Sequence, residues 1–300
     1  MAMVVLLVAM AFRPSFYGYA NNQAFTNVDI FLVVDSTISM MAEDYKGGGV
    51  RLDGVKSDIR GLTEHFAGAR FSLVTFANTA TPELPLTTDT TAVNAAAETI
   101  FVPDTYRAGG SDIGVAAEEL TALLTAHKDR GLNRSRLVFY FGDGENNSNN
   151  RTSFSGLKNI VSGGAVFGYG TESGGKMINQ REAYNAQMYN RKVYESSKYV
   201  RDYSAFQPAI SKASYENLDK IASELGIKSF KRNDGGSVGD LMKDFRFERS
   251  HLADDGAVAY AETYYLLAII FLILVVLEWR TLFLHYRRIK QSSKSAESEP

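Results

Sequence analysis

The sequence predicts an α/β fold with a doubly wound, mostly parallel sheet. Two observations predict it: uninterrupted apolar runs typical of strands buried on both faces, and helical periodicity between those runs. Residues 28–34 read VDIFLVV and residues 136–141 read RLVFYF, with amphipathic stretches between them. Strands that alternate with helices favour a parallel sheet covered by helices on both faces.

The expected elements follow one another along residues 28–230. Strands are expected at 28–34, 70–76, 82–86, 136–141, 164–169 and 227–230, and helices at 52–66, 92–100, 112–127 and 215–225. The segment 82–86 is expected to be a short edge strand paired in a hairpin. In such folds ligands bind beyond the carboxyl ends of the strands, so polar residues at those ends are the candidates for a site.

The composition excludes several classes of function. A net charge of -2 argues against a nucleic-acid binder that works through bulk charge. The chain has no cysteine, which excludes disulfides, thiolate zinc sites and a cysteine nucleophile. The four histidines lack metal-ligand spacing, which argues against a histidine-rich zinc centre; they are His65, His127, His251 and His285.

Three polar clusters fall where the fold predicts a site. The first strand runs into Asp35, Thr37 and Ser39; a Gly-Gly turn ending in Ser111 opens the third helix; and the strand RLVFYF ends next to Asp143. Each cluster alone is an ordinary set of turn and helix-cap residues. Together they supply two carboxylates and three hydroxyls, which are hard oxygen ligands suited to Mg²⁺, Mn²⁺ or Ca²⁺.

Two further acidic residues, Asp112 and Glu145, border these clusters. We expect them to act as a helix cap or as support for the ligands, with tuning of the site or general-base catalysis as the alternative.

The order and spacing of these clusters resemble the metal-ion-dependent adhesion site (MIDAS) of von Willebrand factor A (VWA) domains. The matching positions are Asp35, Thr37, Ser39, Ser111 and Asp143, and Ile38 stands where the family often has glycine. The resemblance covers residues 29–230 and implies a domain that binds a partner carboxylate at an open position of a divalent ion.

Segments such as TISMMAEDY, RLDGVKSDI and FSLVTFANTA resemble more closely the membrane-anchored bacterial VWA proteins of the actinobacterial and Bat-like type. That resemblance implies a role in the assembly of envelope complexes or in adhesion. It also implies a MoxR-type AAA+ ATPase system as a candidate partner.

The C-terminal region predicts a membrane anchor. Residues 264–277 read YYLLAIIFLILVVL, and a span of 262–284 has the length needed to cross a bilayer. Acidic residues precede the apolar run 264–277 and five basic residues follow it, which places the C-terminus in the cytoplasm and the VWA domain outside. The alternative is a buried core helix. We expect a helical stalk at 238–261 and a polar cytoplasmic tail at 285–300.

The N-terminal segment, residues 1–20, is apolar but short for a span. It is interpreted as an uncleaved anchor, with a cleaved signal peptide as the alternative. The first reading gives a two-pass protein and the second a single-pass protein. The VWA domain is assigned to residues 21–237.

Two other patterns lie inside that range. Residues 170–177 read GTESGGKM, which nearly matches a phosphate-binding loop but has Met177 where the loop needs a hydroxyl. Residues 177–213 form a Tyr-rich insertion that we expect to be helical, with some tyrosines packed on the domain and others in solvent. The alternative is an aromatic surface for a partner.

Enzyme activity is not expected, because the sequence lacks a recognisable nucleophile and base pattern. The alternatives to an ion-dependent binding domain are a structural membrane scaffold whose metal site does not function and a Mg²⁺-dependent hydrolase.

Overall fold

The computed structural model describes residues 15–18, 25–102, 112–128, 134–148, 152–243, 259–262, 268–281 and 283. Contacts divide the chain into two units. One is Ala24–Asp255, and the other combines Met1–Gln23 with Gly256–Pro300. The candidate site lies in the first unit.

The first unit is built on a six-stranded sheet with the order β11-β6-β5-β2-β3-β4. All neighbours are parallel except β3 and β4, which form an antiparallel pair at one edge. The strands are β2 (Val28–Asp35), β3 (Arg70–Phe76), β4 (Ala80–Thr87), β5 (Ser135–Gly142), β6 (Gly163–Gly168) and β11 (Lys228–Lys231). The parallel order brings the carboxyl ends of β2 and β5 side by side at one edge of the sheet.

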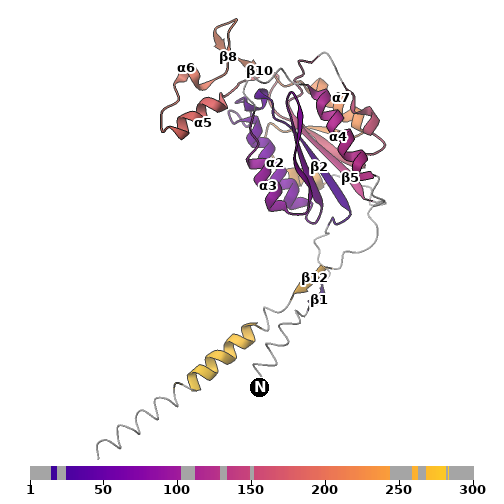
Figure 1. Ribbon diagram of the computed structural model, residues 1–300, viewed down its shortest axis with the longest axis vertical. Helices are drawn as coiled ribbons and strands as arrows, with labels where there is room; N and C mark the ends of the chain where they lie inside the picture. The colour runs from indigo at the N-terminus through magenta and orange to yellow at the C-terminus, as the bar shows by residue number, and fades with distance from the viewer. Residues whose placement is uncertain are drawn as a thin grey trace, which may run out of the picture. The chain divides into compact units, whose positions relative to one another are not determined.

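Helices cover both faces of this sheet (Figure 1). On one face lie α2 (Arg51–His65), α3 (Thr90–Glu98) and α8 (Val238–Lys243). On the other lie α4 (Ile113–Lys128), the short 3₁₀ helix η2 (Phe154–Leu157) and α7 (Tyr215–Leu225). The prediction of an α/β fold with a mostly parallel sheet is therefore confirmed.

The central strand β2 shows why its sequence is apolar throughout. Ile30, Leu32 and Val34 belong to the core on one face, while Phe31 and Val33 belong to the core on the other. All five are fully buried. A strand covered on both faces has no solvent-facing position, so the usual alternation of apolar and polar residues disappears.

The elements expected from sequence are confirmed, with small changes at their ends. The strand at 70–76 and the helix at 215–225 have the expected bounds. The edge strand β4 is longer than expected, at Ala80–Thr87, and pairs with β3 through an irregular register.

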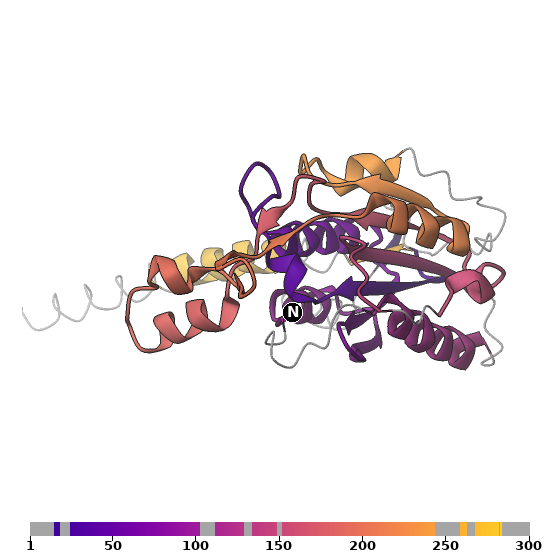
Figure 2. The same cartoon turned by 90° about the horizontal axis from the view of Figure 1, so that it is seen from above.

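The insertion at 177–213 is less helical than expected. It contains α5 (Gln180–Met188), a single turn α6 (Glu195–Lys198), the hairpin of β8 (Arg201–Asp202) and β9 (Gln207–Pro208), and β10 (Ile210–Ser211). The last of these pairs with β7 (Gly175–Lys176). Figures 1 and 2 both show α5 and α6 standing out from the body of the domain.

The helical stalk expected at 238–261 differs from what is found. Val238 and Met242 of α8 are buried in the core against α2, so this helix is part of the domain. Residues Ala259–Glu262 form a strand, β12, that pairs with β1 (Ser15–Gly18), so the prediction of a helix is wrong at these positions. Neither strand was expected from the sequence.

The remaining described part of the second unit is helical at residues 268–281 and at 283. Most of its large apolar side chains are exposed, Leu272 at 63% and Trp279 at 74% among them. No helix in the described ranges combines the length and the hydrophobicity that a membrane crossing requires. The rest of the expected span at 262–284 lies outside the described residues, as do most of residues 1–20 and all of the tail.

Candidate metal-ion site

The structure describes four of the five predicted ligands. Three of these four lie at the end of β2 and in the turn that follows it. Asp35 ends the strand, and its Oδ1 accepts a hydrogen bond of 2.8 Å from the backbone N–H of Thr37. The hydroxyls of Thr37 and Ser39 lie 2.7 Å apart. Ser39 sits in the short 3₁₀ helix η1 (Ile38–Met41). All three side chains are buried, so the turn presents a carboxylate and two hydroxyls to one small volume.

Asp143 joins them from the adjacent strand. It follows Gly142, the last residue of β5, and is fully buried. A Cβ at position 142 would lie 3.1 Å from Cβ and 3.3 Å from Oδ2 of Asp35, so the glycine lets the two strand ends approach closely. Gly144 has a φ of +76°, and a Cβ there would lie 2.3 Å from the carbonyl oxygen of Ser214. These two glycines explain why the turn reads GDG.

Ser111, the fifth predicted ligand, lies outside the described residues. Its neighbour Asp112 precedes α4, and its Oδ1 accepts a hydrogen bond of 2.8 Å from the backbone N–H of Gly114. Asp112 is therefore a helix N-cap. The loop that carries Ser111 thus leads into a helix whose start is fixed.

Arg51 is a member of the site that the sequence analysis missed. It is the first residue of α2, its side chain is fully buried, and its Nη1 donates to Oδ2 of Asp143 at 2.7 Å. A basic residue in the first turn of a helix opposes the helix dipole. This unfavourable placement was the available signal that Arg51 serves another purpose.

The same guanidinium binds two further segments. Its Nε and Nη2 donate to both carboxylate oxygens of Asp44, at 2.7 and 2.8 Å. It also donates to the hydroxyl of Ser211 at 2.8 Å and to the backbone carbonyls of Ser39 and Ser211. Arg51 therefore ties the loop after β2, the loop after β5 and the end of the insertion together.

Asp35 contrasts with this well-satisfied group. Its Oδ2 is buried and has no hydrogen-bond partner among the described residues. Burial, together with repulsion from Asp143, raises the pKa of the Asp35 carboxyl well above its ordinary value of 3.8. A buried carboxylate without a cation is costly, and such groups are usually paired or coordinate a metal.

Glu145 adds a third carboxyl group near the first two. Burial and repulsion from Asp143 raise the pKa of Glu145, and its Oε1 accepts a hydrogen bond of 2.9 Å from the backbone N–H of Lys212. The carboxyl ends of β2 and β5 therefore carry several acidic side chains, whose negative charge Arg51 offsets only in part. A bound cation would lower the repulsion among these carboxyl groups.

The donor set fits a hard divalent cation. It combines the free oxygen of Asp35, the hydroxyls of Thr37 and Ser39, and Asp143. Oxygen ligands of this kind suit Mg²⁺, Mn²⁺ or Ca²⁺. The described residues contain no group of three or more acidic or histidine side chains placed to hold a metal ion, so hydroxyls have to supply part of any coordination here.

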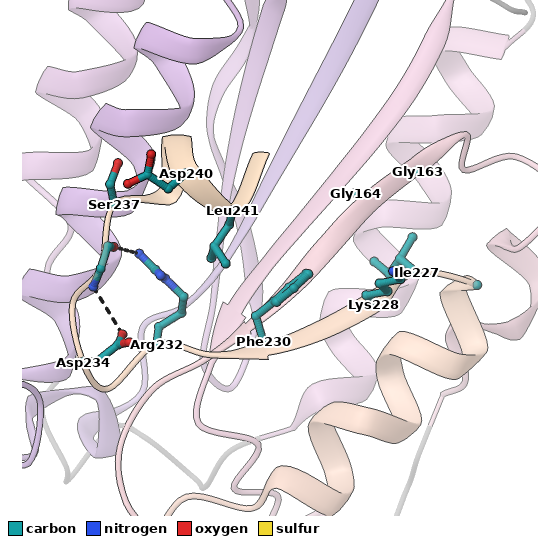
Figure 3. A pocket seen from close by; sticks show the side chains of 12 residues that line it. Gly163, Gly164, Ile227, Lys228, Phe230, Arg232, Asp234, Ser237, Asp240 and Leu241 are labelled. Atoms are coloured by element: carbon teal, nitrogen blue, oxygen red, sulfur yellow. Dashed lines mark hydrogen bonds between the residues drawn. The ribbon is translucent and has the colours of Figure 1, made fainter. Parts of the chain in front are cut away.

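A pocket of about 870 Å³ lies elsewhere, along the edge strand β11 (Figure 3). It is lined by β11, by the start of β6 and by the segment from Asp234 to Leu241, and none of the predicted ligands lines it. Two of its charged groups are engaged: Arg232 pairs with Asp58 at 2.7 Å, and Asp234 accepts from the N–H of Gly236. We therefore regard it as a feature of the fold around α8.

The glycine loop at 170–177 does not have the form of a phosphate-binding loop. Its backbone N–H groups at Gly170 and Thr171 donate to Asn233 and Asp44, both at 2.7 Å. The loop continues into the short strand β7 instead of a helix. The departure from the phosphate-binding pattern at Met177 indicated the same from the sequence.

One comparison with known proteins gives a family match for part of the chain. Residues 30–145 match the family model for the von Willebrand factor type A domain. No curated protein sequence gives a significant match.

Two crystal structures are similar in fold. The conserved hypothetical protein BatB from Bacteroides thetaiotaomicron has a TM-score of 0.54 at 20% identity, over 72% of this chain and 95% of that chain. An aerotolerance-related membrane protein from Bacteroides fragilis, with multiple mutations to serine, has a TM-score of 0.55 at 20% identity, over 72% and 96% of the two chains. Residues 30–145 are therefore similar to a von Willebrand factor type A domain, and the fold of the chain is similar to that of these two proteins.

Proposed function

We propose that the VWA domain binds an acidic protein partner through a divalent cation, with Mg²⁺ as the first candidate and Mn²⁺ or Ca²⁺ as alternatives. Asp35, Thr37, Ser39, Ser111 and Asp143 would hold the ion. The observation that supports this most directly is the buried, unpartnered Oδ2 of Asp35 beside a second buried carboxylate. The ion would supply an open coordination position to a carboxylate oxygen of the partner.

The neighbouring residues have supporting roles in this proposal. Arg51 holds Asp143 in place through its 2.7 Å ion pair. Glu145 is fixed by Lys212, and Asp112 caps α4. Because both acidic neighbours have such positional roles, we propose binding and not catalysis.

We further propose that the chain is anchored in a membrane through the apolar segment at 264–277, with the VWA domain outside the cytoplasm. The support is the apolar run itself and the basic residues that follow it. The proposed setting is the bacterial envelope, in complex assembly or adhesion. A MoxR-type ATPase system is a candidate partner by family resemblance.

Calorimetric titration of the full chain with Mg²⁺ tests the ion site. We expect wild type to bind and both Asp35→Ala and Asp143→Ala to lose binding, by about 100-fold or more in affinity, while circular dichroism shows the sheet intact. Unchanged affinity in both variants would rule out the proposed site. Exchange of Mg²⁺ for Mn²⁺ or Ca²⁺ in the same titration identifies the preferred ion.

A further inference from the structure

The insertion at residues 177–213, named the arm from here on, exposes large aromatic side chains. Tyr189, Tyr194 and Tyr203 are 68–70% exposed, and Phe206 is 83% exposed. Tyr199 differs, because it is half-buried and its hydroxyl donates to Glu43 at 2.8 Å. One tyrosine thus anchors the arm while the others face solvent. Groups of exposed aromatic residues of this kind mark interaction surfaces.

The tip of the arm is ordered although its rings are not packed. Asp202 accepts hydrogen bonds from the backbone N–H groups of Ser204 and Ala205, which fixes the turn between β8 and β9. Phe206, in this turn, has a φ of +54°. That conformation is unfavourable for a bulky residue. A ring that is both strained and exposed contributes nothing evident to the fold, which points to a role in binding.

The arm is joined to the loops that form the ion site. Ile178 donates from its backbone N–H to the carbonyl of Met41, at the end of η1, and Gln180 accepts from the N–H of Val102. The first part of the arm therefore contacts the ligand-bearing turn after β2.

The end of the arm contacts the same site from the other side. The hydroxyl of Ser211 accepts from Arg51, which holds Asp143, and Lys212 donates from its backbone N–H to Glu145. The arm thus leaves the domain and returns to it beside the proposed ion ligands. Between these two attachments, α5 and α6 project from the body of the domain (Figures 1 and 2).

The charge of the arm is opposite to that of the whole chain. Residues 177–213 contain six Lys or Arg and three Asp or Glu, a net charge of +3, against -2 for the chain. A basic surface favours an acidic partner and speeds its encounter.

We propose that the arm is a second contact surface for the same acidic protein partner, and that it recognises apolar side chains that flank the carboxylate bound at the ion. This inference rests on the proposed ion-dependent function. We favour a protein over an anionic lipid surface because the arm is hydrogen-bonded to the ion-site loops at both ends, so one ligand can reach both.

A random-peptide phage library provides the probe. The full chain, kept in solution with a mild detergent, is panned in the presence of Mg²⁺, and bound phage are eluted with chelator. The test variant combines Tyr189→Ser, Tyr194→Ser and Phe206→Gly. The matched control combines Tyr189→Phe, Tyr194→Phe and Phe206→Tyr, which keeps all three rings.

Wild type is expected to select peptides that combine an acidic residue with Leu, Phe or Trp. The best of these, made synthetically, should bind the test variant at least about tenfold more weakly and the control within about twofold of wild type. Calorimetric Mg²⁺ affinity and thermal melting of the test variant should match wild type, because glycine relieves the φ of Phe206 and the rings are exposed.

The other outcomes separate the two proposals. Chelator-eluted peptides without apolar enrichment, or equal binding to the test variant, would overturn the role of the arm and leave the ion site standing. An absence of any chelator-eluted peptide would overturn the ion-dependent function and this inference with it. A second assay tests for a role in lipid binding. The protein is inserted into phosphatidylcholine vesicles, and the clustering of these vesicles with phosphatidylserine vesicles is measured. Clustering lost in the test variant, with peptide binding unchanged, would overturn the assignment to a protein.

Discussion

The two ends of the central strand β2 each carry a buried aspartate, and their surroundings differ. At the amino end, Asp29 is paired with Arg70 and Arg134 at 2.6 and 2.7 Å. Burial by itself would raise the pKa of Asp29, but the hydrogen bonds from the two arginines outweigh it and hold that pKa below its ordinary value. At the carboxyl end, Asp35 has an oxygen without a partner among the described residues and a raised pKa.

This difference separates a residue that stabilises the fold from the residue that we propose binds a cation. A buried carboxylate that is fully paired contributes to the fold, whereas one left unpaired costs stability and calls for a ligand. At the carboxyl end the nearby guanidinium of Arg51 is directed to Asp143 and Asp44, and Asp35 is left for a cation to neutralise.

Arg51→Gln is expected to have the largest effect on this comparison. It removes the buried charge that neutralises Asp143 and Asp44, so the free energy of unfolding should fall by about 3–5 kcal/mol. Arg51→Lys, which keeps the charge but loses the planar fork, should lose less. Urea unfolding measured in chelator compares the two. Equal losses would show that the geometry of the guanidinium matters more than its charge.

Asp29→Asn is expected to lower the free energy of unfolding by about 2 kcal/mol, because the partly exposed arginines lose their buried partner. Glu98→Gln is a matched control, since its pair with Arg60 is exposed on both sides and should contribute within about 0.5 kcal/mol. Mg²⁺ affinity should not change in either variant. A change in affinity for Asp29→Asn would mean that the two ends of the strand are coupled.

Asp35→Asn should act in the opposite direction. In chelator its free energy of unfolding should equal that of wild type or exceed it by up to about 1 kcal/mol, because an unpaired buried charge is removed. In Mg²⁺ the order should reverse, since wild type gains binding energy that the variant lacks. Thermal melting in both conditions measures this. A variant less stable than wild type in chelator would contradict the view that Asp35 is an unsatisfied group.

The smallest expected effect is on the pH dependence of stability. The pKa of Asp29 is lower in the folded chain than its ordinary value of 3.8. Its contribution is therefore fully present above that value and is lost as the pH falls through the folded pKa. Asp29→Asn should remove this part of the acid dependence, so the stability difference between wild type and variant should shrink on acidification. A difference that stays constant with pH would argue against the arginine pairs as the cause.

Much of the candidate site could be predicted from the sequence because parallel strands place their carboxyl ends at one edge. The structure places Asp35, Thr37, Ser39 and Asp143 at this edge. Arg51 could not be placed in the site, because the partners that join it to the second strand end and to the insertion are distant in sequence; Asp143 is 92 residues away and Ser211 is 160. Only packing of α2 against the end of the sheet brings these groups within hydrogen-bond reach.

The insertion at 177–213 likewise could be predicted only in part from the sequence. Its tyrosine pattern predicted that some rings would pack on the domain and others would face solvent, but not which ones. Exposure depends on the turns that Asp202 and the strand pairs impose, and those turns interrupt the helix expected from the sequence.

By itself, therefore, the sequence determined the α/β architecture, the order of its main elements and the polar residues at the strand ends, because these follow from local apolar periodicity and from the direction of parallel strands. The tertiary structure alone decided which buried aspartate is paired and which is left open. The reason is that pairing depends on the positions of Arg51, Arg70 and Arg134, which are set by packing between segments far apart in the chain.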